Sequence, residues 1–494
     1  MAFERSSGVI LHPTSLPGPY GIGSLGKEAY EFIDFLSDTK QKLWQICPLG
    51  PTGYGDSPYQ CFSAFAGNPF LVSLEKLKEE GLVKEDDLGE DNFPKDKVDY
   101  GWVIDFKVGV LKKAYNRFKK KSNKKDNEDF VAFCQDNIEW LEDYTFFMAL
   151  KDEFDGRPWI EWDDDIKFRK EEAVDKYKKE LKDEIQFHKF IQYLFFKQWN
   201  EVKGYANKQG ISIIGDVPIF VAFDSADAWA NPDIFLFDEK KKPTKVAGVP
   251  PDAFSETGQL WGNPLYDWDE LKSRDYNWWI KRFEAILDMV DHVRLDHFRG
   301  FAAYWAVPAD EDTAMNGEWV DGPGADFFQA IKDQLGELPI IAEDLGVITE
   351  DVDELREGFG LIGMKVLQFA FDSGEKNKYL PHNYTKDFVV YTGTHDNDTT
   401  VGWFESLGEE EKHFIREYLD VDGSNIAWDL IEAAWGSVAV FAIAPLQDIL
   451  SLGSEGRMNT PGKPAGNWQW RFTKDMLSDE VINKLREVTE KHRN

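Results

Sequence analysis

Eight short apolar segments, each followed by polar or glycine-rich residues, divide most of this chain. They are Gly8–His12, Leu43–Leu49, Ile211–Pro218, His292–Asp296, Pro339–Glu343, Met364–Ala370, Phe388–Thr392 and Ser437–Ala442. Short apolar runs of this kind are typical of strands buried on both faces of a parallel sheet. Helical patterns separate most of them, among them Lys27–Asp38, Asn277–Met289, Gly324–Leu335 and Glu350–Glu357. Eight strands alternating with helices predict an α/β fold of the (β/α)₈ TIM-barrel type.

The second and third apolar segments lie too far apart for a single helical connection. Residues 61–190 between them are largely charged and helix-prone, which predicts a mainly helical insertion between strands two and three. The basic run Lys119–Lys125 is expected to be a solvated loop. Since no internal repeat or low-complexity linker occurs, residues 1–494 are expected to form a single catalytic barrel with large, mainly helical insertions.

Composition restricts the partners and the compartment. The formal net charge is −33, which disfavours nucleic acid, an anionic membrane or an acidic polysaccharide and leaves a neutral substrate. The three cysteines, Cys47, Cys61 and Cys134, are odd in number and widely spaced, which argues against disulfides and a zinc site. The N-terminus lacks a signal-peptide pattern, and the longest apolar run is too short to cross a bilayer. These features together predict a cytoplasmic protein.

One glycine pattern resembles a dinucleotide-binding loop. Gly21–Gly26 has the Gly-x-Gly-x-x-Gly spacing, but Pro17 and Pro19 precede it where a strand is required. The acidic residue expected about twenty positions further on is also missing. We therefore interpret this stretch as the loop after the first strand, and we expect no cofactor.

Carboxylates gather where the predicted strands end. Asp216 lies near the end of the third strand, Asp296 ends the fourth, Glu343 and Asp344 lie at the end of the fifth, and Asp396 comes after the seventh. In a barrel these ends meet at one rim, where the active site lies. Cleavage of a glycosidic bond requires one carboxylic acid to protonate the leaving oxygen and one carboxylate to face the anomeric carbon. The pattern therefore predicts glycoside chemistry, and the 15% of aromatic side chains adds rings on which sugars can stack.

The roles within this set are only partly determined by spacing. Arg294 and Asp296 share a strand face, so the guanidinium should keep Asp296 ionised, as a nucleophile requires. Glu343 and Asp344 point to opposite faces, and periodicity does not decide which one faces the barrel axis. Glu343 is preferred as the acid because of its longer reach.

Several motifs, in this order, resemble the 4-alpha-glucanotransferase family, the amylomaltase or disproportionating-enzyme group of glycoside hydrolase family 77. The motifs are Tyr54–Gln60, Gly215–Phe220, Asp224–Pro232, Gly248–Pro264, Arg294–Gly300, Ile341–Gly346, Thr392–Asn397, Gly456–Pro461 and Gly466–Trp468. The resemblance extends over nearly the whole chain and is weakest from about Leu82 to Lys189. It implies transfer of an α-1,4-glucan segment between maltooligosaccharides, with glucose as donor or acceptor and cyclic glucans as further products. It implies no metal.

The resemblance also implies residue roles. Asp296 would be the nucleophile, Glu343 the general acid and base, and Asp396 the third carboxylate. Further roles concern sugar binding: the donor sugar at Asp216, Arg294, His395 and the platform Tyr59, the acceptor at His297 and Trp261, and other substrate contacts at Ser57, Gln259 and Asn467. Residues 248–259 would form a lid with hinges at Gly248 and Gly258, and Tyr54 would belong to a secondary glucan site.

Two alternatives compete with the transferase. An α-1,4-glucan hydrolase would use the same carboxylates with water as the acceptor, and residues 248–259 with Trp261 favour transfer because they could exclude water. A non-catalytic glucan-binding protein would retain aromatic platforms but could lose an acid. Retention of Asp296, Glu343 and Asp396 together disfavours it.

Overall fold

The computed structural model describes residues 3–251, 255–463 and 465–493, and its centre is a parallel eight-stranded sheet. The strands are β1 (Ser6–Ile10), β2 (Leu43–Gln45), β3 (Ser212–Pro218), β6 (His292–Asp296), β9 (Ile340–Ala342), β10 (Gly363–Val366), β11 (Phe388–Tyr391) and β12 (Phe441–Pro445). They lie in the order β10-β11-β12-β1-β2-β3-β6-β9, and a parallel bridge between Ile341 and Ile362 closes the ring. The predicted (β/α)₈ barrel is thus confirmed.

The first and last strands of the barrel have bounds that differ from the prediction. The first strand begins and ends two residues earlier than expected, and the last covers Phe441–Pro445 where Ser437–Ala442 was expected. Val438 leaves 55% of its surface exposed, so it cannot belong to a strand buried on both faces. Hydrogen-bonded register with the neighbouring strands, not the apolar run itself, sets these bounds.

Side chains alternate between the barrel interior and the surrounding helices. Ile10, Leu43, Ile214, Ile341 and Val389 belong to the cluster that fills the interior. The intervening residues pack outward against helices, as period-two alternation requires. The helices include α1 (Lys27–Asp38), α12 (Asn277–Met289), α13 (Gly324–Leu335), α14 (Glu350–Gly358) and α17 (Ile426–Gly436). The first three have the predicted bounds.

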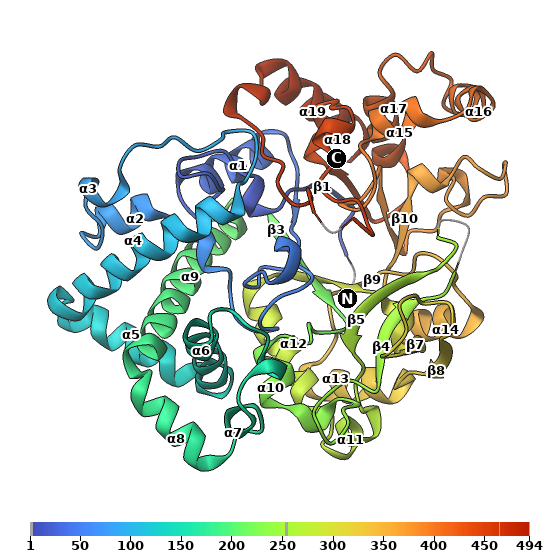
Figure 1. The fold of residues 1–494 in the computed structure, drawn as a ribbon. Coiled ribbons are helices and arrows are strands. Elements are labelled where there is room, and N and C mark those ends of the chain that lie inside the picture. The colour runs from blue at the N-terminus through green and yellow to red at the C-terminus, as the bar shows by residue number, and fades with distance from the viewer. Residues whose placement is uncertain (1–2, 252–254, 464, 494) are drawn as a thin grey trace.

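Residues 61–190 consist mainly of helices, which lie together beside the barrel (Figure 1). These are α2 (Leu74–Glu79), α3 (Glu85–Leu88), α4 (Tyr100–Lys121), α5 (Lys124–Asp136), α6 (Ile138–Glu153), α7 (Asp164–Lys167), α8 (Glu171–Glu180) and the start of α9 (Lys182–Lys208). A separate aromatic cluster that includes Phe147, Trp159 and Trp162 holds part of this region together. Helix α9 then leads directly into β3.

The prediction of a loop at Lys119–Lys125 is wrong. This run ends α4 and begins α5, and only Ser122 and Asn123 lie between the two helices. Lysine has a good helix propensity, so a basic run indicates exposure without excluding a helix. The Asn123 side chain starts α5 by accepting a hydrogen bond from the amide of Asp126 at 2.9 Å.

A second sheet, which the sequence did not predict, lies between β3 and β9 along the chain. It is antiparallel, with the order β5-β4-β7-β8, and contains β4 (Lys245–Val249), β5 (Gln259–Pro264), β7 (Ala303–Pro308) and β8 (Glu318–Asp321). Gly248 and Gly262 interrupt β4 and β5, and β8 is only four residues long, so the apolar pattern is weak. The insertions are therefore not only helical.

The predicted lid at residues 248–259 connects β4 to β5, and residues 252–254 of it lie outside the described residues. Gly248 is not a free hinge, because it pairs with Leu260 on one side and with Trp305 on the other within the sheet. Gly258 does have the left-handed backbone that favours glycine, with φ of 68°.

The remaining helices are short or lie near the C-terminus. They are α10 (Ala226–Ala230), α11 (Trp268–Ser273), α15 (Thr400–Ser406), α16 (Glu409–Leu419), α18 (Leu446–Ile449) and α19 (Asp479–His492). Among the described residues, every helix is too short or too polar to cross a membrane.

Candidate active site

A buried guanidinium joins two carboxylates at the carboxyl end of the barrel. Asp216 on β3 is the register partner of Arg294 on β6. Arg294 Nη1 donates to Asp216 Oδ2 at 2.6 Å and lies 2.9 Å from Asp296 Oδ1, which confirms that Arg294 and Asp296 share a face. The side chains of Asp216 and Arg294 are almost fully buried, whereas 28% of Asp296 remains exposed. Asp296 is therefore an anchored carboxylate that remains partly open to solvent.

The charges in this group depend on each other. Burial raises the pKa of Asp216 to about 6, although Arg294 opposes this rise. Burial by itself would lower the pKa of Arg294, but Asp216 and Asp296 raise it well above its usual value. The guanidinium consequently stays charged beside Asp296.

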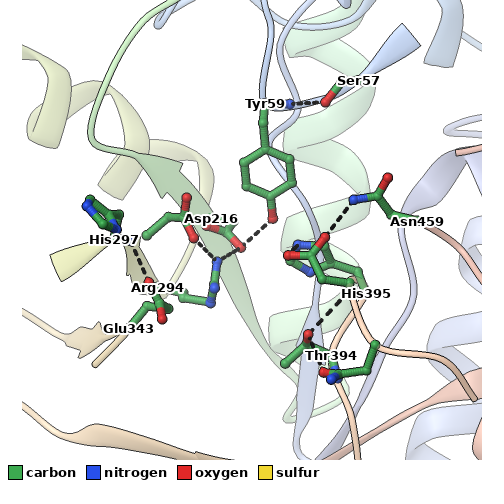
Figure 2. Close-up of polar contacts among 12 residues, drawn as sticks. Ser57, Tyr59, Asp216, Arg294, His297, Glu343, Thr394, His395 and Asn459 are labelled. Atoms are coloured by element: carbon green, nitrogen blue, oxygen red, sulfur yellow. Dashed lines mark hydrogen bonds and ion pairs between the residues drawn. The ribbon is translucent and has the colours of Figure 1, made fainter. Parts of the chain in front are cut away.

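Tyr59 forms one wall next to this group. Its hydroxyl donates to Asp216 Oδ2 at 2.9 Å, and its amide donates to Ser57 Oγ at 3.2 Å. The ring stacks on His395 with centroids 5.1 Å apart and lies 5.8 Å from Trp468. The phenol and the imidazole therefore have fixed orientations (Figure 2).

Glu343 follows β9 and faces Asp296 from the next strand of the barrel. Its Oε2 accepts the amide of His297 at 2.8 Å, and its Oε1 accepts the amide of Leu345 at 3.0 Å. His297 adopts a left-handed backbone, with φ of 50°, at the turn after β6. Burial, followed by the negative charge of Asp296, raises the pKa of Glu343 to about 8. Glu343 is thus a protonated acid at neutral pH beside a carboxylate.

Asp344, the competing candidate, points away from this cluster. It accepts the amide of Met364 at 2.6 Å and lies 3.2 Å from Arg356 Nε, with 5% of its side chain exposed. The structure therefore assigns Asp344 to the packing between β9, β10 and α14. The alternative that periodicity left open is decided by the neighbours of each carboxylate.

Asp396 is held by groups from two loops. Asn459 Nδ2 donates to its Oδ1 at 2.6 Å, and His395 Nε2 lies 3.3 Å from its Oδ2. Although burial opposes it, the charge and hydrogen bond of His395 hold the pKa of Asp396 well below its usual range. Nearly half of the side chain remains exposed, so the carboxylate is open to solvent. Sequence reasoning did not single out Asn459, although it lies in the Gly456–Pro461 motif.

A buried carboxylate anchors both ends of the loop that carries His395 and Asp396. Asp448 accepts the hydroxyl of Thr392 at 2.6 Å, together with the amide and the hydroxyl of Thr400, both at 2.7 Å. Sequence reasoning missed this residue, because Asp448 lies almost fifty positions further along the chain. Its burial and its contacts with Thr392 and Thr400 are evident only in the folded chain.

Trp261 and His297 form a second aromatic pair, and the His297 amide binds Glu343. Their rings meet edge to face at 4.8 Å, and Trp261 Nε1 donates to Gln259 Oε1 at 3.2 Å. Burial lowers the pKa of His297 to about 4, so the imidazole is neutral at pH 7. Strand β5 thus brings Trp261 and Gln259 beside the turn that also binds Glu343.

Asn467, a predicted substrate contact, and Tyr54, the predicted secondary glucan site, lie outside this cluster. Asn467 uses its side-chain amide within its own loop, where it accepts from Thr460 N at 2.9 Å and donates to Lys463 O at 2.9 Å. Tyr54 lies in the 3₁₀ turn Tyr54–Asp56 with 80% of its surface exposed.

Two hollows border the buried floor of the site. One, of about 430 Å³, is lined by His395, Asn397 and Arg457, and the other, of about 540 Å³, is lined by Tyr59 and Asp216. Within the described part of the chain, no group of three or more His, Cys, Asp or Glu side chains could hold a metal ion. The arrangement brings together an anchored carboxylate and a protonated acid, the pair that acetal cleavage requires.

Comparisons with known proteins agree with this chemistry. The model of the 4-alpha-glucanotransferase family matches residues 11–477. The 4-alpha-glucanotransferase of Thermus thermophilus is 52% identical over 498 residues, which cover 99% of both chains. That of Synechocystis is 53% identical over 495 residues, covering 99% of this chain and 98% of the relative. A solved amylomaltase from Streptococcus agalactiae, in complex with acarbose, has a TM-score of 0.97 and 42% identity, and the match covers 99% of this chain and all of that one.

Proposed function

The chain belongs to the 4-alpha-glucanotransferase family, glycoside hydrolase family 77, and we propose that Asp296, Glu343 and Asp396 carry out its reaction. The enzyme cleaves an α-1,4 bond of a glucan and transfers the freed segment to an acceptor sugar. The proposal concerns the role of each side chain in a retaining double displacement. The proposal depends on one arrangement. Arg294 contacts Asp296, and the charge of Asp296 helps to raise the pKa of Glu343.

In the first step, the Asp296 carboxylate attacks the anomeric carbon and forms a covalent glycosyl ester. The glycosidic bond breaks, and Glu343 gives its proton to the departing oxygen. Arg294 keeps one oxygen of Asp296 in place. Asp296 thereby supplies the electron pair, and Glu343 supplies the proton.

The donor sugar lies between the buried floor and Asp396. Asp396 binds sugar hydroxyls and favours the cationic transition state, and His395 and Asn459 hold it in its charged form. Asp216, Arg294 and His395 supply further polar contacts, and Tyr59 supplies the aromatic wall. Ser57 and Asn467 act near this end of the groove.

In the second step, Glu343 takes a proton from the 4-hydroxyl of the acceptor, which attacks the ester and releases Asp296. His297 and Trp261 form the seat of the acceptor, and Gln259 orients Trp261. Residues 248–259 cover the groove as a lid and disfavour attack by water. Transfer therefore exceeds hydrolysis.

The substrates are α-1,4-glucans, with maltooligosaccharides and glucose as donor or acceptor. The acarbose bound to the amylomaltase of Streptococcus agalactiae supports a groove that accepts such oligosaccharides. Tyr54, exposed on its own turn, contributes a secondary glucan site. We further propose that residues 1–494 act as one catalytic unit in the cytoplasm, with neither nucleic acid nor membrane as a partner.

Incubation with maltotriose alone tests this function. Transfer exchanges one α-1,4 bond for another, so we expect glucose and a series of longer chains while total reducing ends stay nearly constant. Chromatography of all products and a reducing-end assay measure both quantities. A steady rise of reducing ends without longer chains would establish a hydrolase.

A further inference from the structure

Trp319 on β8 is unusually open for a tryptophan. It leaves 42% of its surface exposed, whereas large aromatic rings are mostly buried on average. The Arg299 guanidinium lies 3.9 Å from its ring centroid, and Trp305 contacts it edge to face at 5.3 Å. These two neighbours fix the orientation of the indole and leave the rest of it facing solvent.

Arg299 connects this indole to the frame of the general acid. It lies two residues beyond His297, and its Nη1 donates to the carbonyl of Val347, two residues beyond Leu345. His297 and Leu345 are the residues whose amides hold the two oxygens of Glu343. Two residues span at most about 7 Å of chain. Arg299 therefore links the stretch 297–299 to the stretch 345–347 at a short distance from Glu343.

Val347 is a second exposed apolar side chain at the same place. It leaves 62% of its surface open, and its backbone carbonyl, not its side chain, accepts the hydrogen bond of Arg299. Arg299 itself is 8% exposed, so most of it lies below the surface. The outer rim beyond Glu343 therefore presents an indole and a branched apolar side chain on a rigid support.

The chemistry of this rim favours a neutral ligand. Asp321 ends the same strand as Trp319, and Asp351 interacts with Arg299. With a net charge of −33 over the whole chain, an anion would be repelled. A flat, partly polar ring on a fixed support suits the C–H face of a sugar.

We propose that Trp319, with Val347 beside it, binds the glucose units of the acceptor glucan that lie beyond the first acceptor unit. The proposal rests on the proposed role of Glu343, because the acceptor hydroxyl must reach that carboxyl group. The rest of the acceptor chain then runs outward past the two segments that hold Glu343. Trp319 lies where these segments meet the surface. It therefore affects the binding of long acceptors and takes no part in bond cleavage.

The test separates acceptor binding from donor cleavage. A maltosyl fluoride donor loads the enzyme without a sugar leaving group, and glucose, maltose and maltotetraose then serve as acceptors. Acceptor KM is measured for the wild-type enzyme, Trp319→Ala and Trp319→Phe. Val438→Ala is the matched control, since Val438 is an exposed apolar residue before the amino end of β12.

We expect Trp319→Ala to raise the KM for maltotetraose about tenfold, as loss of one stacking contact predicts, and the KM for glucose less than about twofold. Trp319→Phe should recover most of the difference, and Val438→Ala should match the wild type. Equal changes for all acceptors, or none for maltotetraose, would overturn the proposal. The rate of fluoride release reports whether each variant is folded. If the wild type transfers to no acceptor, the proposed function fails regardless of Trp319.

Discussion

The side chains of the active-site cluster differ in protonation state, and this difference sets their roles. Arg294 remains charged between Asp216 and Asp296, and Glu343 keeps its proton because burial and the charge of Asp296 disfavour its anion. Two carboxyl groups in different environments can thus act as acid and nucleophile at the same pH. The contacts of each carboxylate, more than its position in the sequence, determine which role it can take.

Replacing the nucleophile tests the first role. Asp296→Asn should lower kcat by at least about 10⁴-fold, because an amide cannot form the ester intermediate. The fold should persist, since Arg294 retains its contact with Asp216. Kinetics with maltotriose and the melting temperature measure the two effects. Asp288→Asn on α12, where the residue is exposed, is the control, and a fluoro-sugar label on Asp344 or Asp396 would contradict the assignment.

Replacing the acid tests the second role. Glu343→Gln should lower turnover of maltotriose about 10³-fold, since its leaving group must be protonated. A glycosyl fluoride needs no such proton and should still form the covalent intermediate. Equal losses with both donors would show that Glu343 is not the acid.

The pH profile gives an independent check on the same residue. The acid is active when protonated, and its pKa is raised to about 8. For the wild type, kcat/KM with maltotriose should therefore fall as pH rises through about 8, whereas formation of the intermediate from the fluoride should not. A fall of kcat/KM that begins at the ordinary pKa of glutamate would contradict the raised pKa of Glu343.

At the scale of elements, loops from distant parts of the chain complete the site. Asp448 on α18 holds both ends of the loop after β11, and Asn459 reaches across to Asp396. Strand β5 of the antiparallel sheet places Trp261 against the turn that follows β6. The barrel supplies the carboxylates, and these added elements determine what can reach them.

Truncation of Trp261 tests the role of β5. Trp261→Ala should raise the KM for glucose as acceptor about tenfold and increase the hydrolysed fraction, because the acceptor would lose an aromatic contact and water could enter. Product ratios from maltotriose measure the partition, and Trp261→Phe should remain close to the wild type. An unchanged partition in the alanine variant would place the acceptor elsewhere.

At the scale of the whole molecule, the charge of −33 opposes compaction. Raising the ionic strength from 0.01 to 0.15 M shortens the screening length from about 30 to 8 Å, so repulsion should weaken. We expect the melting temperature at pH 7 to rise by about 2 °C, measured by calorimetry with NaCl and, as a control for ion identity, with KCl. A fall on adding salt would mean that ion pairs such as Lys245–Glu318 outweigh the net repulsion.

The sequence by itself determined the barrel and the residue types at its rim. Apolar segments with intervening helical periods are local signals, so β3, β6 and β11 and the helices α1, α12 and α13 could be predicted closely. The period of two also placed Arg294 and Asp296 on one face, and the motifs identified the family. The Lys119–Lys125 run and the antiparallel sheet could not be predicted, because charge does not specify a loop and the sheet is stabilised by pairing between distant strands.

Tertiary structure alone decided which groups meet. Glu343 faces Asp296 while Asp344 faces Arg356, because barrel closure sets the orientation of β9. The contacts of Asn459 with Asp396 and of Asp448 with Thr392 join residues more than fifty positions apart. A local pattern records only that successive side chains of a strand point to opposite faces. Its partner depends on how the closed barrel aligns segments that are remote in the chain, and so do its pKa and its role.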